Sequence, residues 1–330
     1  MPEISRTQHP TPPPINAVVI GRNEGERLKN CLKSLAGQVH RLIYVDSGSS
    51  DGSVAAARAI GAEVVELDLT VPFTAARARN AGLAALKDQS ETSLVQFVDG
   101  DCTVDALWLE TSSAFLADHD DVAVVCGRRR EQHPEVSVYN RLCDQEWDTP
   151  VGEALACGGD ALMRVGPLRQ LGGYRESLIA GEEPELCVRL RQNGWRIWRL
   201  DAEMTRHDAQ ITSFEQWAKR ARRAGHAFAE GAALHGAPPE RHWVRETRRA
   251  LLWGLALPAS LLSSVMISPW ALLALAIYPL QFLRLSRAMP LEQAFFTVLG
   301  KFPESVGVLE YHWNRLRGRS RRIIEYKSAG

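Results

Sequence analysis

Several common signatures are missing from this chain of 330 residues, and each absence removes a class of protein. The six cysteines are scattered with no Cys-x-x-Cys pair, so they lack zinc-site spacing and fit core packing in a reducing compartment. The formal net charge is zero and no basic–aromatic repeat occurs, which argues against a nucleic-acid partner. Residues 1–14 are polar and proline-rich without the apolar stretch of a signal peptide, and we expect a disordered leader there.

A dinucleotide-binding fingerprint is also missing. No Gly-x-Gly-x-x-Gly motif follows the first predicted strand, where Gly21-Arg22-Asn23-Glu24 stands instead. Short apolar runs nevertheless alternate with amphipathic stretches, which predicts an α/β sheet. The expected strands are 17–20, 42–45, 62–67, 94–98 and 122–126, and the expected helices are 26–35, 53–60, 75–86 and 105–116. Beyond residue 127 the rhythm is irregular, and we expect a helix at 182–192, a strand at 195–200 and a helix after a capping box at 213–216.

Acidic residues follow three of the predicted strands. The strand at 94–98 leads into Asp99-Gly100-Asp101, where Gly100 allows a tight turn that brings both carboxylates to one point. Two such carboxylates repel each other unless a cation lies between them, and oxygen ligands suit Mg²⁺ or Mn²⁺. An isolated Asp-x-Asp more often caps the next helix. Here Glu24 and Asp46 also follow strands, at the edge where open α/β sheets bind ligands.

Seven motifs lie in order along residues 15–230. They are Arg22-Asn23-Glu24, Asp46 with the turn at 47–52, Ala78-Arg79-Asn80-Ala81-Gly82, Asp99-Gly100-Asp101, Gly158-Gly159-Asp160-Ala161, Leu171-Gly172-Gly173-Tyr174 and Gly181-Glu182-Glu183-Pro184-Glu185-Leu186. In this order and spacing they resemble the family 2 glycosyltransferases of the GT-A fold. The resemblance implies a Rossmann-like open mixed sheet with helices on both faces, in a domain at 15–235. Family members transfer a sugar from a nucleotide sugar to an acceptor, usually with inversion at the anomeric carbon.

The resemblance also implies roles for the acids that follow the strands. Glu24 and Asp46 help to hold the nucleoside of the donor. Asp99 and Asp101 bind its diphosphate through Mn²⁺ or Mg²⁺, and Asp99 belongs to the nucleotide-sugar site as well. A metal there neutralises the charge that gathers on the departing nucleoside diphosphate.

The catalytic base implied by the resemblance is a carboxylate at the start of the helix 182–192, with Glu183 as first choice and Glu182 as second. The family usually has Asp where this chain has Glu183, and the extra methylene changes the reach by about 1.5 Å. The helix N-terminus favours the ionised form and moderates basicity. In the alternative interpretation, both acids serve only the helix dipole.

Other polar residues have two interpretations each. His207 is a third metal ligand, as in some GT-A enzymes, or an exposed loop histidine. Arg220 and Arg223 clamp the diphosphate, or they belong to a solvated or lipid-facing basic helix. The run 128–130 of three arginines is predicted to be a mobile basic loop more than a phosphate contact. Arg79, with Asn80, is expected to fix a loop and a helix start rather than touch the donor.

Charge and hydropathy change in the last third of the chain. Residues 205–330 carry 18 Lys and Arg against 9 Asp and Glu, yet no charge occurs between Arg249 and Arg284. The uncharged run 250–283 predicts membrane contact, although a buried soluble helix pair is the alternative. Cations at both ends favour a hairpin broken near Ser268-Pro269 over a single span. We expect a membrane-associated helical region at 236–330, with this apolar hairpin and a basic tail at 284–330 on anionic lipid.

Together these features predict a glycosyltransferase at the cytoplasmic face of the cell (inner) membrane. Its expected partners are a nucleotide-sugar donor, membrane lipid and a lipid-linked or glycan acceptor, as in the synthesis of lipid-linked glycan or cell-surface polysaccharide. One alternative is a catalytically silent GT-A scaffold that binds nucleotide sugar in a membrane complex, which the Glu at position 183 motivates. A nucleotidyltransferase ranks lower because no Gly-rich triphosphate loop is present, and a missing Gln-x-x-Arg-Trp motif disfavours a processive polymerase.

Overall fold

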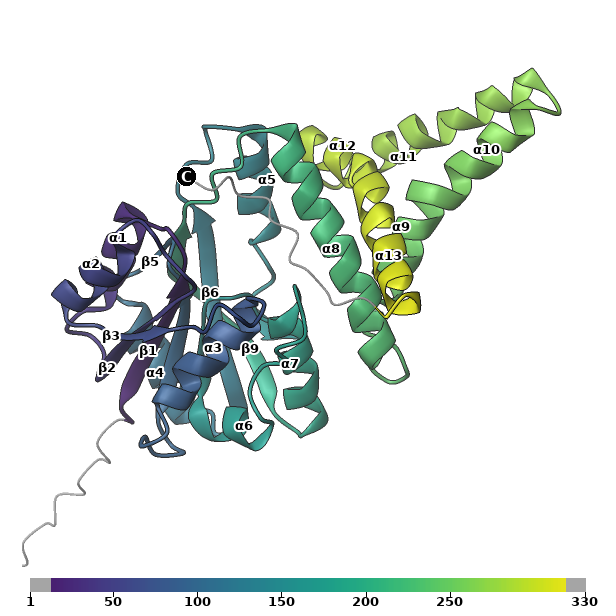
Figure 1. Ribbon diagram of the computed structural model, residues 1–330. Coiled ribbons are helices and arrows are strands. Elements are labelled where there is room, and N and C mark those ends of the chain that lie inside the picture. The colour runs from purple at the N-terminus through teal and green to yellow at the C-terminus, as the bar shows by residue number, and fades with distance from the viewer. Residues whose placement is uncertain (1–12, 319–330) are drawn as a thin grey trace, which may run out of the picture.

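Figure 1 shows the computed structural model as a sheet covered by helices, beside a group of helices from which a long arm projects. The structure describes residues 13–318, except for the side chains at 265, 269 and 271. Residues 1–12 of the expected leader lie outside the described residues, as do Arg319, Arg321 and Arg322 of the expected basic tail.

The described strands form one nine-stranded mixed sheet with the order β3-β2-β1-β4-β8-β6-β9-β5, and β7 pairs with β9. The bounds are β1 (Ile15–Gly21), β2 (Arg41–Asp46), β3 (Glu63–Glu66), β4 (Leu94–Asp99), β5 (Cys102–Val104), β6 (Val122–Glu131), β7 (Gly152–Ala154), β8 (Ala161–Arg164) and β9 (Arg196–His207). Neighbours among β1 to β4 run parallel, whereas β8 lies antiparallel between β4 and β6. The expected open mixed sheet is therefore present.

Helices alternate with the strands of this sheet. Their bounds are α1 (Glu26–Leu35), α2 (Ser53–Ile60), α3 (Ala75–Ala85), α4 (Trp108–Asp118), α5 (Val138–Glu146), α6 (Val165–Gln170) and α7 (Glu182–Gln192). The predicted bounds of α1, α2 and α7 are confirmed. In α1 the apolar positions recur at helical spacing, and all of them are buried. The central strands carry the core, where the buried Trp108 indole donates to Gln96 of β4 at 2.8 Å.

The prediction of a mobile basic loop at 128–130 is wrong. These arginines lie in β6, which continues to Glu131 and pairs with β9 over this stretch. Pairing with β9 holds the backbone, and acidic side chains neutralise the charges: Asp144 accepts from Arg128, and Glu203 accepts from Arg130. From the sequence alone, a run of like charges predicts a solvated loop. In the structure, each of these arginines instead has an acidic partner.

The last third of the chain is helical. The elements are α8 (Phe214–His235), α9 (Val244–Leu251), a π-helical turn (Leu252–Ala256), α10 (Leu257–Val265), a 3₁₀ segment (Pro269–Ala276), α11 (Ile277–Leu285), α12 (Leu291–Leu299) and α13 (Lys301–Leu316). The predicted capping box at the start of α8 is confirmed, with Ser213 and Gln216 bonded reciprocally. Helix α8 packs along α13, and Gly307 of α13 sits so close to Arg222 that a Cβ would meet its carbonyl oxygen at 1.9 Å.

Residues 252–285, called the arm below, leave this helical group as a hairpin (Figure 1). Helical backbone continues without interruption from α9 through the π-helical turn into α10, and the chain reverses at residues 266–268. Among residues 13–318, no helix has both the length and the apolar character needed to cross a membrane.

Candidate active site

The acids after β4 lie in a turn that the sheet fixes. Gly100 donates its backbone N–H to Ile20 of β1 at 2.8 Å, and a Cβ at Gly100 would lie 3.1 Å from the same oxygen. Only glycine fits this close backbone approach without a shift. The chain then enters β5, which pairs antiparallel with β9 and sets Cys102 opposite His207. The turn and this pairing bring Asp101 and His207 together although 106 positions separate them.

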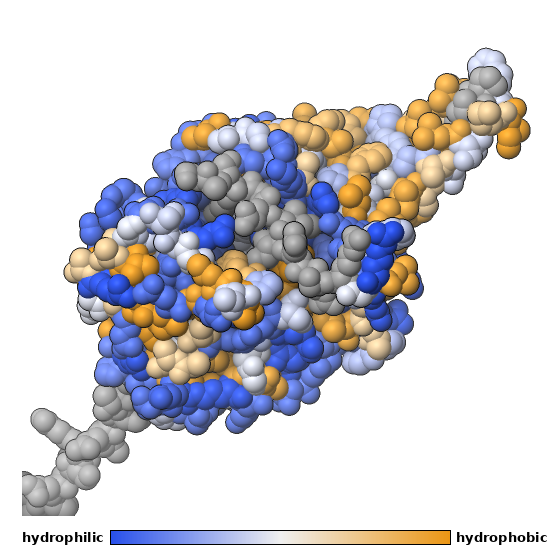
Figure 2. All heavy atoms as spheres, viewed as in Figure 1, coloured by the Kyte–Doolittle hydropathy of each residue, from blue (hydrophilic) through white to orange (hydrophobic). Residues whose placement is uncertain are grey.

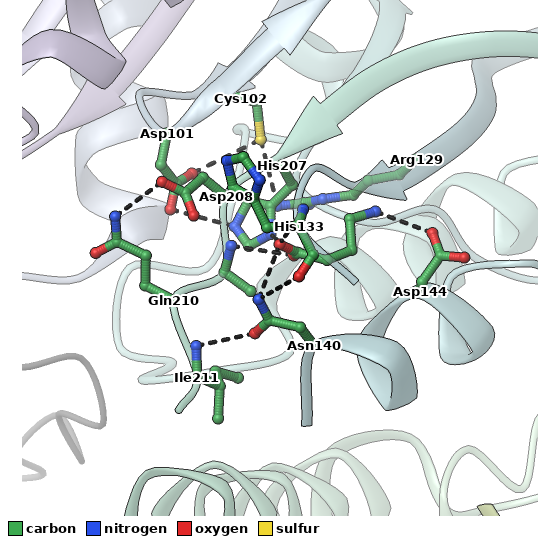
Figure 3. Close-up of polar contacts among 12 residues, drawn as sticks. Asp101, Cys102, Arg129, His133, Asn140, Asp144, His207, Asp208, Gln210 and Ile211 are labelled. Atoms are coloured by element: carbon green, nitrogen blue, oxygen red, sulfur yellow. Dashed lines mark hydrogen bonds and ion pairs between the residues drawn. The ribbon is translucent and has the colours of Figure 1, made fainter. Parts of the chain in front are cut away.

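Asp101 and His207 form a buried polar pair (Figure 3). The His207 Nε2 lies 3.2 Å from the Asp101 Oδ2, and its Nδ1 lies 3.9 Å from the Glu131 Oε2. The Trp147 ring contacts the imidazole edge-to-face at 4.8 Å between centroids. In metal sites the imidazole nitrogen that faces away from the ion is commonly oriented by a carboxylate, and here Nδ1 faces Glu131 from beyond hydrogen-bond distance. His207 is therefore a buried strand residue rather than an exposed loop residue.

The donor atoms of Asp101, Cys102 and His207 all lie within 4.8 Å of one another, so their chemistry decides which ion they suit. Burial raises the pKa of the Cys102 thiol well above its usual value, although Arg129 opposes the shift, so the sulfur stays protonated. A carboxylate oxygen and an imidazole nitrogen remain. Their 3.2 Å separation is close to the roughly 3 Å between adjacent ligand atoms of an octahedral ion with bonds of about 2.1 Å. Asp101 and His207 therefore fit a divalent ion, and the imidazole nitrogen favours Mn²⁺ over Mg²⁺.

A hydrogen-bond network holds the segment that follows His207. Glu131 accepts from the backbone N–H of Ala209 at 3.1 Å and from the Asn140 amide at 3.2 Å. The Asn140 carbonyl oxygen accepts from the backbone of Ile211 at 3.1 Å (Figure 3). Because α5 and β6 both bond to this segment, the position of His207 is fixed by elements far away in the sequence.

Asp99 is more exposed than Asp101, and two guanidinium groups hold it. Arg79 donates to one oxygen at 2.9 Å and Arg129 to the other at 3.3 Å. Burial raises the pKa of Asp99, but these two cations outweigh it and hold the pKa below its usual value. The Asp99 backbone N–H donates to Asp160 at 3.0 Å, which fixes the end of β4. Asp99 is thus an ionised carboxylate beside the buried Asp101–His207 pair.

Arg79 is a buried cation that joins this edge to the start of α7. Its Nη1 lies 2.9 Å from an oxygen of Glu182 and 2.9 Å from an oxygen of Glu183, while Nη2 bonds Asp99. Burial opposes its charge, but the carboxylates of Glu183, Asp99 and Glu182 raise the pKa of Arg79 well above its usual value. One side chain therefore fixes the distance between the predicted phosphate-binding acid and the predicted base.

Glu183 has the electrostatics of a base that works near neutral pH. Burial and the neighbouring Glu182 raise its pKa to about 7, even though Arg79 lowers it. Burial and like charge therefore outweigh the helix N-terminus, which the sequence had suggested would favour ionisation. A carboxylate with a pKa near 7 is ionised about half the time at neutral pH and still basic enough to take a proton.

The loop before α7 is held by Trp243, a residue between α8 and α9. Gly181 caps α7 with φ +81°, and a Cβ there would meet the Trp243 ring at 2.6 Å. The same ring lies against Gly231 of α8 and contacts Phe228 edge-to-face at 5.3 Å between centroids. Glycines at 181 and 231 make room for the indole, and the indole in turn braces the turn that presents Glu182 and Glu183.

The predicted nucleoside acid Glu24 lies beside the Asp99–Asp101 turn. Its Cγ is 3.3 Å from the position of a Cβ on Gly100, and its carboxylate lies 2.7 Å from the Arg27 guanidinium. Glu24 therefore belongs to the same cluster as the strand-end acids, and its role toward a nucleoside stays a prediction.

Asp46 lies at the same edge but points into its own turn. Its carboxylate accepts from the Tyr44 hydroxyl at 2.8 Å and from the backbone N–H groups of Gly48 and Ser49 at 2.9 Å each. It is buried, and it shapes the turn at 47–49. A nucleoside contact for Asp46 stays a prediction.

The two arginines predicted as a clamp lie on α8 at different contacts. Arg220 forms two hydrogen bonds with the Glu146 carboxylate, at 2.8 and 3.0 Å. Arg223 donates to the backbone oxygen of Ile179 at 2.9 Å, in the loop that leads to Gly181. Arg223 thus supports the approach to α7, while Arg220 ties α8 to α5. Their contact with a diphosphate stays a prediction.

Sequence reasoning missed the parts played by Arg79 and Arg129. Arg79 lies in one of the seven motifs, yet its expected role was to fix a helix start, and Arg129 was assigned to a loop. Arg129 reaches Asp99 and stacks over Trp147 with its guanidinium carbon 4.9 Å from the ring centroid. The one available signal was arginine in otherwise apolar surroundings: Arg79 follows Ala78 in a helix of small residues that packs on β1 and β2.

Comparison with known proteins finds similarity to glycosyltransferases. Residues 17–168 match the family model described as Glycosyl transferase family 2. A pre-mycofactocin glycosyltransferase of Mycobacterium tuberculosis is 30% identical over 317 residues, covering 88% of this chain and 63% of that protein. Glycosyltransferase AglE of Haloferax volcanii is 29% identical over 200 residues, covering 57% and 64%. The chain thus spans less than two thirds of the length of these curated relatives.

Among solved structures, the mannosyltransferase PcManGT from Pyrobaculum calidifontis, in complex with GDP-Man and Mn²⁺, has the same fold. The TM-score is 0.65 at 18% identity, and the match covers 91% of this chain and 88% of that one. The fold agreement extends past the sheet into the helical third of the chain.

Proposed function

We propose that this chain, whose residues 17–168 match the model of glycosyl transferase family 2, is a metal-dependent inverting glycosyltransferase. It moves a sugar from a nucleoside diphosphate sugar to an acceptor hydroxyl. One observation carries the proposal: Arg79 holds Glu183, a carboxylate with a pKa of about 7, in the same cluster as Asp99 and the Asp101–His207 pair. A base beside an acid cluster that fits a divalent ion is what sugar transfer from a diphosphate requires.

Glu183 is the base in this proposal. An acceptor hydroxyl is a weak nucleophile until a carboxylate takes its proton, and an oxygen of Glu183 receives that proton as the new bond to the anomeric carbon forms. The hydroxyl attacks the face opposite the departing diphosphate, so the configuration inverts. Arg79 stays paired with Glu182 and Asp99 when Glu183 is neutralised, which keeps the base in place during the reaction.

Charge on the leaving diphosphate is the second requirement. Asp101 and His207, with Asp99 beside them, would hold a divalent ion, and that ion would neutralise charge on the departing nucleoside diphosphate. Mn²⁺ is the first ion to test, because the mannosyltransferase of the same fold was solved with Mn²⁺ and GDP-Man. The Arg129 guanidinium at Asp99 adds a fixed positive group at the same rim.

The acceptor and the location are further parts of the proposal. We infer a lipid-linked acceptor and work at the cytoplasmic face of the cell (inner) membrane, in the synthesis of lipid-linked glycan or cell-surface polysaccharide. The support is the run of 34 residues without charge at 250–283, bounded by arginines on both sides. A growing glycan on a lipid would be held where such a segment meets the membrane.

Donor binding is the first test. A panel of nucleotide sugars is screened by thermal unfolding with and without Mn²⁺, since a donor at 100 times its Kd stabilises the fold by about 2.7 kcal/mol. The donor found is then used to measure hydrolysis and transfer. Failure of every nucleotide sugar to raise Tm with Mn²⁺ present would contradict the proposal.

Asp101 is the residue on which the metal assignment is tested. The Asp101→Asn variant keeps the shape of the side chain and is expected to lose Mn²⁺-dependent stabilisation and turnover, as is Asp101→Ala. The matched control is Asp120→Asn, a surface acid whose side chain is fully exposed. Retained turnover in both Asp101 variants would remove the metal site from the proposal.

A catalytically silent scaffold that binds nucleotide sugar is the second candidate, and Glu183 in place of the family's usual Asp is the observation that favours it. It predicts donor binding without turnover across a panel of acceptors, and donor affinity unchanged in Glu183→Gln. The pKa of about 7 for Glu183 favours the enzyme, because a silent site has no need of a tuned base.

A further inference from the structure

The arm exposes apolar side chains on both of its limbs and at its turn. Met266 and Ile267 at the turn are 89% and 90% exposed, and further exposed side chains are Leu262, Trp270, Leu273 and Leu280. Figure 2 shows apolar residues along the projecting arm, while hydrophilic residues dominate much of the sheet domain in this view. A helix that docks on a protein partner normally has one apolar stripe and a polar opposite face. This arm carries no charged residue between Arg249 and Arg284.

Polar groups of the arm bond to the arm itself. The hydroxyls of Ser260, Ser263 and Ser264 each donate to a backbone oxygen four residues earlier, at 2.8 to 2.9 Å. At the turn, the backbone N–H groups of residues 266–268 all donate to oxygens in the last turn of α10. The Tyr278 hydroxyl donates to the Trp253 backbone oxygen across the two limbs at 2.7 Å. Internal satisfaction of this kind is what hydrocarbon surroundings require.

Positive charges lie at both ends of the uncharged run 250–283. Arg245, Arg248 and Arg249 precede this run on α9, Arg284 follows it in the last turn of α11, and Arg287 lies just beyond the arm. The uncharged part of the first limb, residues 250–265, is about 24 Å long at 1.5 Å per residue. That is shorter than the roughly 30 Å hydrocarbon core, so a hairpin with both basic ends at the headgroups enters the bilayer and returns.

We propose that the arm inserts into an anionic lipid bilayer from one side as a hairpin, with Met266, Ile267 and Trp270 deepest and the flanking arginines at the headgroups. This deepens the membrane location proposed above and rests on it, but it does not depend on the chemistry of the site. Close packing anchors the arm to the enzyme: a Cβ at Gly254 would meet the Lys301 backbone oxygen of α13 at 1.9 Å. Insertion therefore fixes the orientation of the sheet domain relative to the lipid surface.

The test is flotation of the full chain with vesicles of phosphatidylglycerol and phosphatidylcholine, and with phosphatidylcholine alone. Ile267→Glu puts a carboxylate at the turn and is expected to lower partitioning by about 100-fold. The matched control is Leu155→Glu, which adds the same charge at an apolar residue that is 76% exposed on the sheet domain, and it is expected to float like wild type. Arg248→Gln with Arg249→Gln is expected to weaken binding by about 30-fold, only with the anionic lipid and less at high salt.

Insertion depth has its own measurement. Lipids brominated in the acyl chains should quench tryptophan fluorescence of the bound protein, and the quenching should fall in Trp270→Phe. Equal flotation of Ile267→Glu and wild type, or no flotation of wild type, would overturn the proposal. So would a dimer in lipid-free buffer that dissociates on Ile267→Glu, because the surface would then join two copies. Donor hydrolysis in Ile267→Glu separates the two proposals, since loss of flotation with full hydrolysis leaves the proposed chemistry intact.

Discussion

The carboxyl edge of the sheet and the arm both depart from the usual pattern of buried apolar and exposed charged residues. The sheet edge buries charged side chains, and the arm exposes apolar ones. At the edge, Arg79, Glu182 and Asp101 are charged yet at most 6% exposed, whereas apolar Ile267 on the arm is 90% exposed. Charged side chains are almost never fully buried without partners, and large exposed apolar patches are uncommon on monomers. At the sheet edge, ion pairs between neighbouring side chains neutralise the buried charges. On the arm, the apolar side chains remain exposed.

This difference indicates what kind of partner each region can bind. Buried charges held by Arg79 keep a fixed geometry that suits a charged ligand, because the groups are already desolvated and oriented before the ligand arrives. Exposed apolar side chains contribute favourable free energy only when a partner removes them from water. The first region has the fixed charges that the proposed chemistry needs, and the second has the exposed apolar surface that the proposed lipid contact needs. The predictions below alter one region at a time, from the largest expected effect to the smallest.

Glu183→Gln removes the proposed base without changing side-chain size. We expect kcat to fall by about 10²–10⁴-fold, because the acceptor hydroxyl loses its proton acceptor, while donor binding remains. Turnover at saturating donor and the donor-induced rise in Tm are the two measurements. Glu110→Gln, at an exposed position of α4, is the control and should leave both unchanged. Full turnover in Glu183→Gln would transfer the role to Glu182.

Arg79→Met tests how much the buried ion pairs of Arg79 stabilise the sheet edge. Three carboxylates would lose their shared cation in a buried place, and we expect a loss of about 3–5 kcal/mol in the free energy of unfolding. The loss should be larger at high pH, because the unpaired acids are then ionised and cannot relieve the repulsion by binding protons. Urea unfolding at two pH values measures both effects.

The control for Arg79→Met is Arg58→Met. Arg58 forms a pair with Glu66 on the surface, where both side chains are more than half exposed, so a change of at most about 1 kcal/mol is expected. Equal losses in the two variants would show that burial does not strengthen the Arg79 contacts.

Trp243→Ala and Trp270→Ala make the same substitution in the two regions. Trp243 fills the space left by Gly181 and Gly231, so its loss should reduce the free energy of unfolding by about 1–3 kcal/mol and lower kcat by loosening the turn before Glu183. Trp270 is 77% exposed, so its loss should change stability by less than about 0.5 kcal/mol. Equal effects on kcat would mean that Trp243 does not position the base.

Much of the sheet edge was predictable because the residues that form it end parallel strands. Asp99 ends β4 and Asp101 follows it, Glu24 follows β1, and regular alternation made those strands visible. The partner His207 was named from the resemblance, but its burial was not foreseen. It depends on the pairing of β5 with β9, and a three-residue strand such as β5 has no periodic pattern to read.

The arginines could not be predicted because sequence patterns place charge at the surface. Arg79 is buried only because α3 packs its small residues against β1 and β2 and the start of α7 lies nearby, which is a tertiary fact. Similarly, β8 is inserted antiparallel between β4 and β6, and its pairing with β4 joins residues more than 60 positions apart. On the arm, by contrast, the uncharged composition predicted membrane contact, with a buried helix pair as the alternative, and the structure leaves apolar side chains such as Ile267 exposed.

Glu182→Gln is expected to have a smaller effect than the loss of Trp243, and it tests why the pKa of Glu183 is about 7. Burial is the largest cause and the charge of Glu182 is the second, so removing that charge should lower the pKa of Glu183. Glu183 must be ionised to act as a base, so wild-type activity should fall as the pH drops through about 7. In Glu182→Gln the activity should persist to lower pH. An unchanged or raised midpoint in the pH profile of kcat would remove Glu182 from this role.

The smallest expected effect is that of Ile267→Glu on stability in lipid-free buffer. A buried apolar residue replaced by Glu would cost several kcal/mol, but this side chain is already in water, so the free energy of unfolding should change by less than about 0.5 kcal/mol. Urea unfolding without lipid measures it. The same variant should bind vesicles far more weakly, so the effect of one substitution would depend wholly on whether lipid is present. A large loss of stability without lipid would instead mean that the arm packs against protein in solution, and the contrast between the two regions would fail.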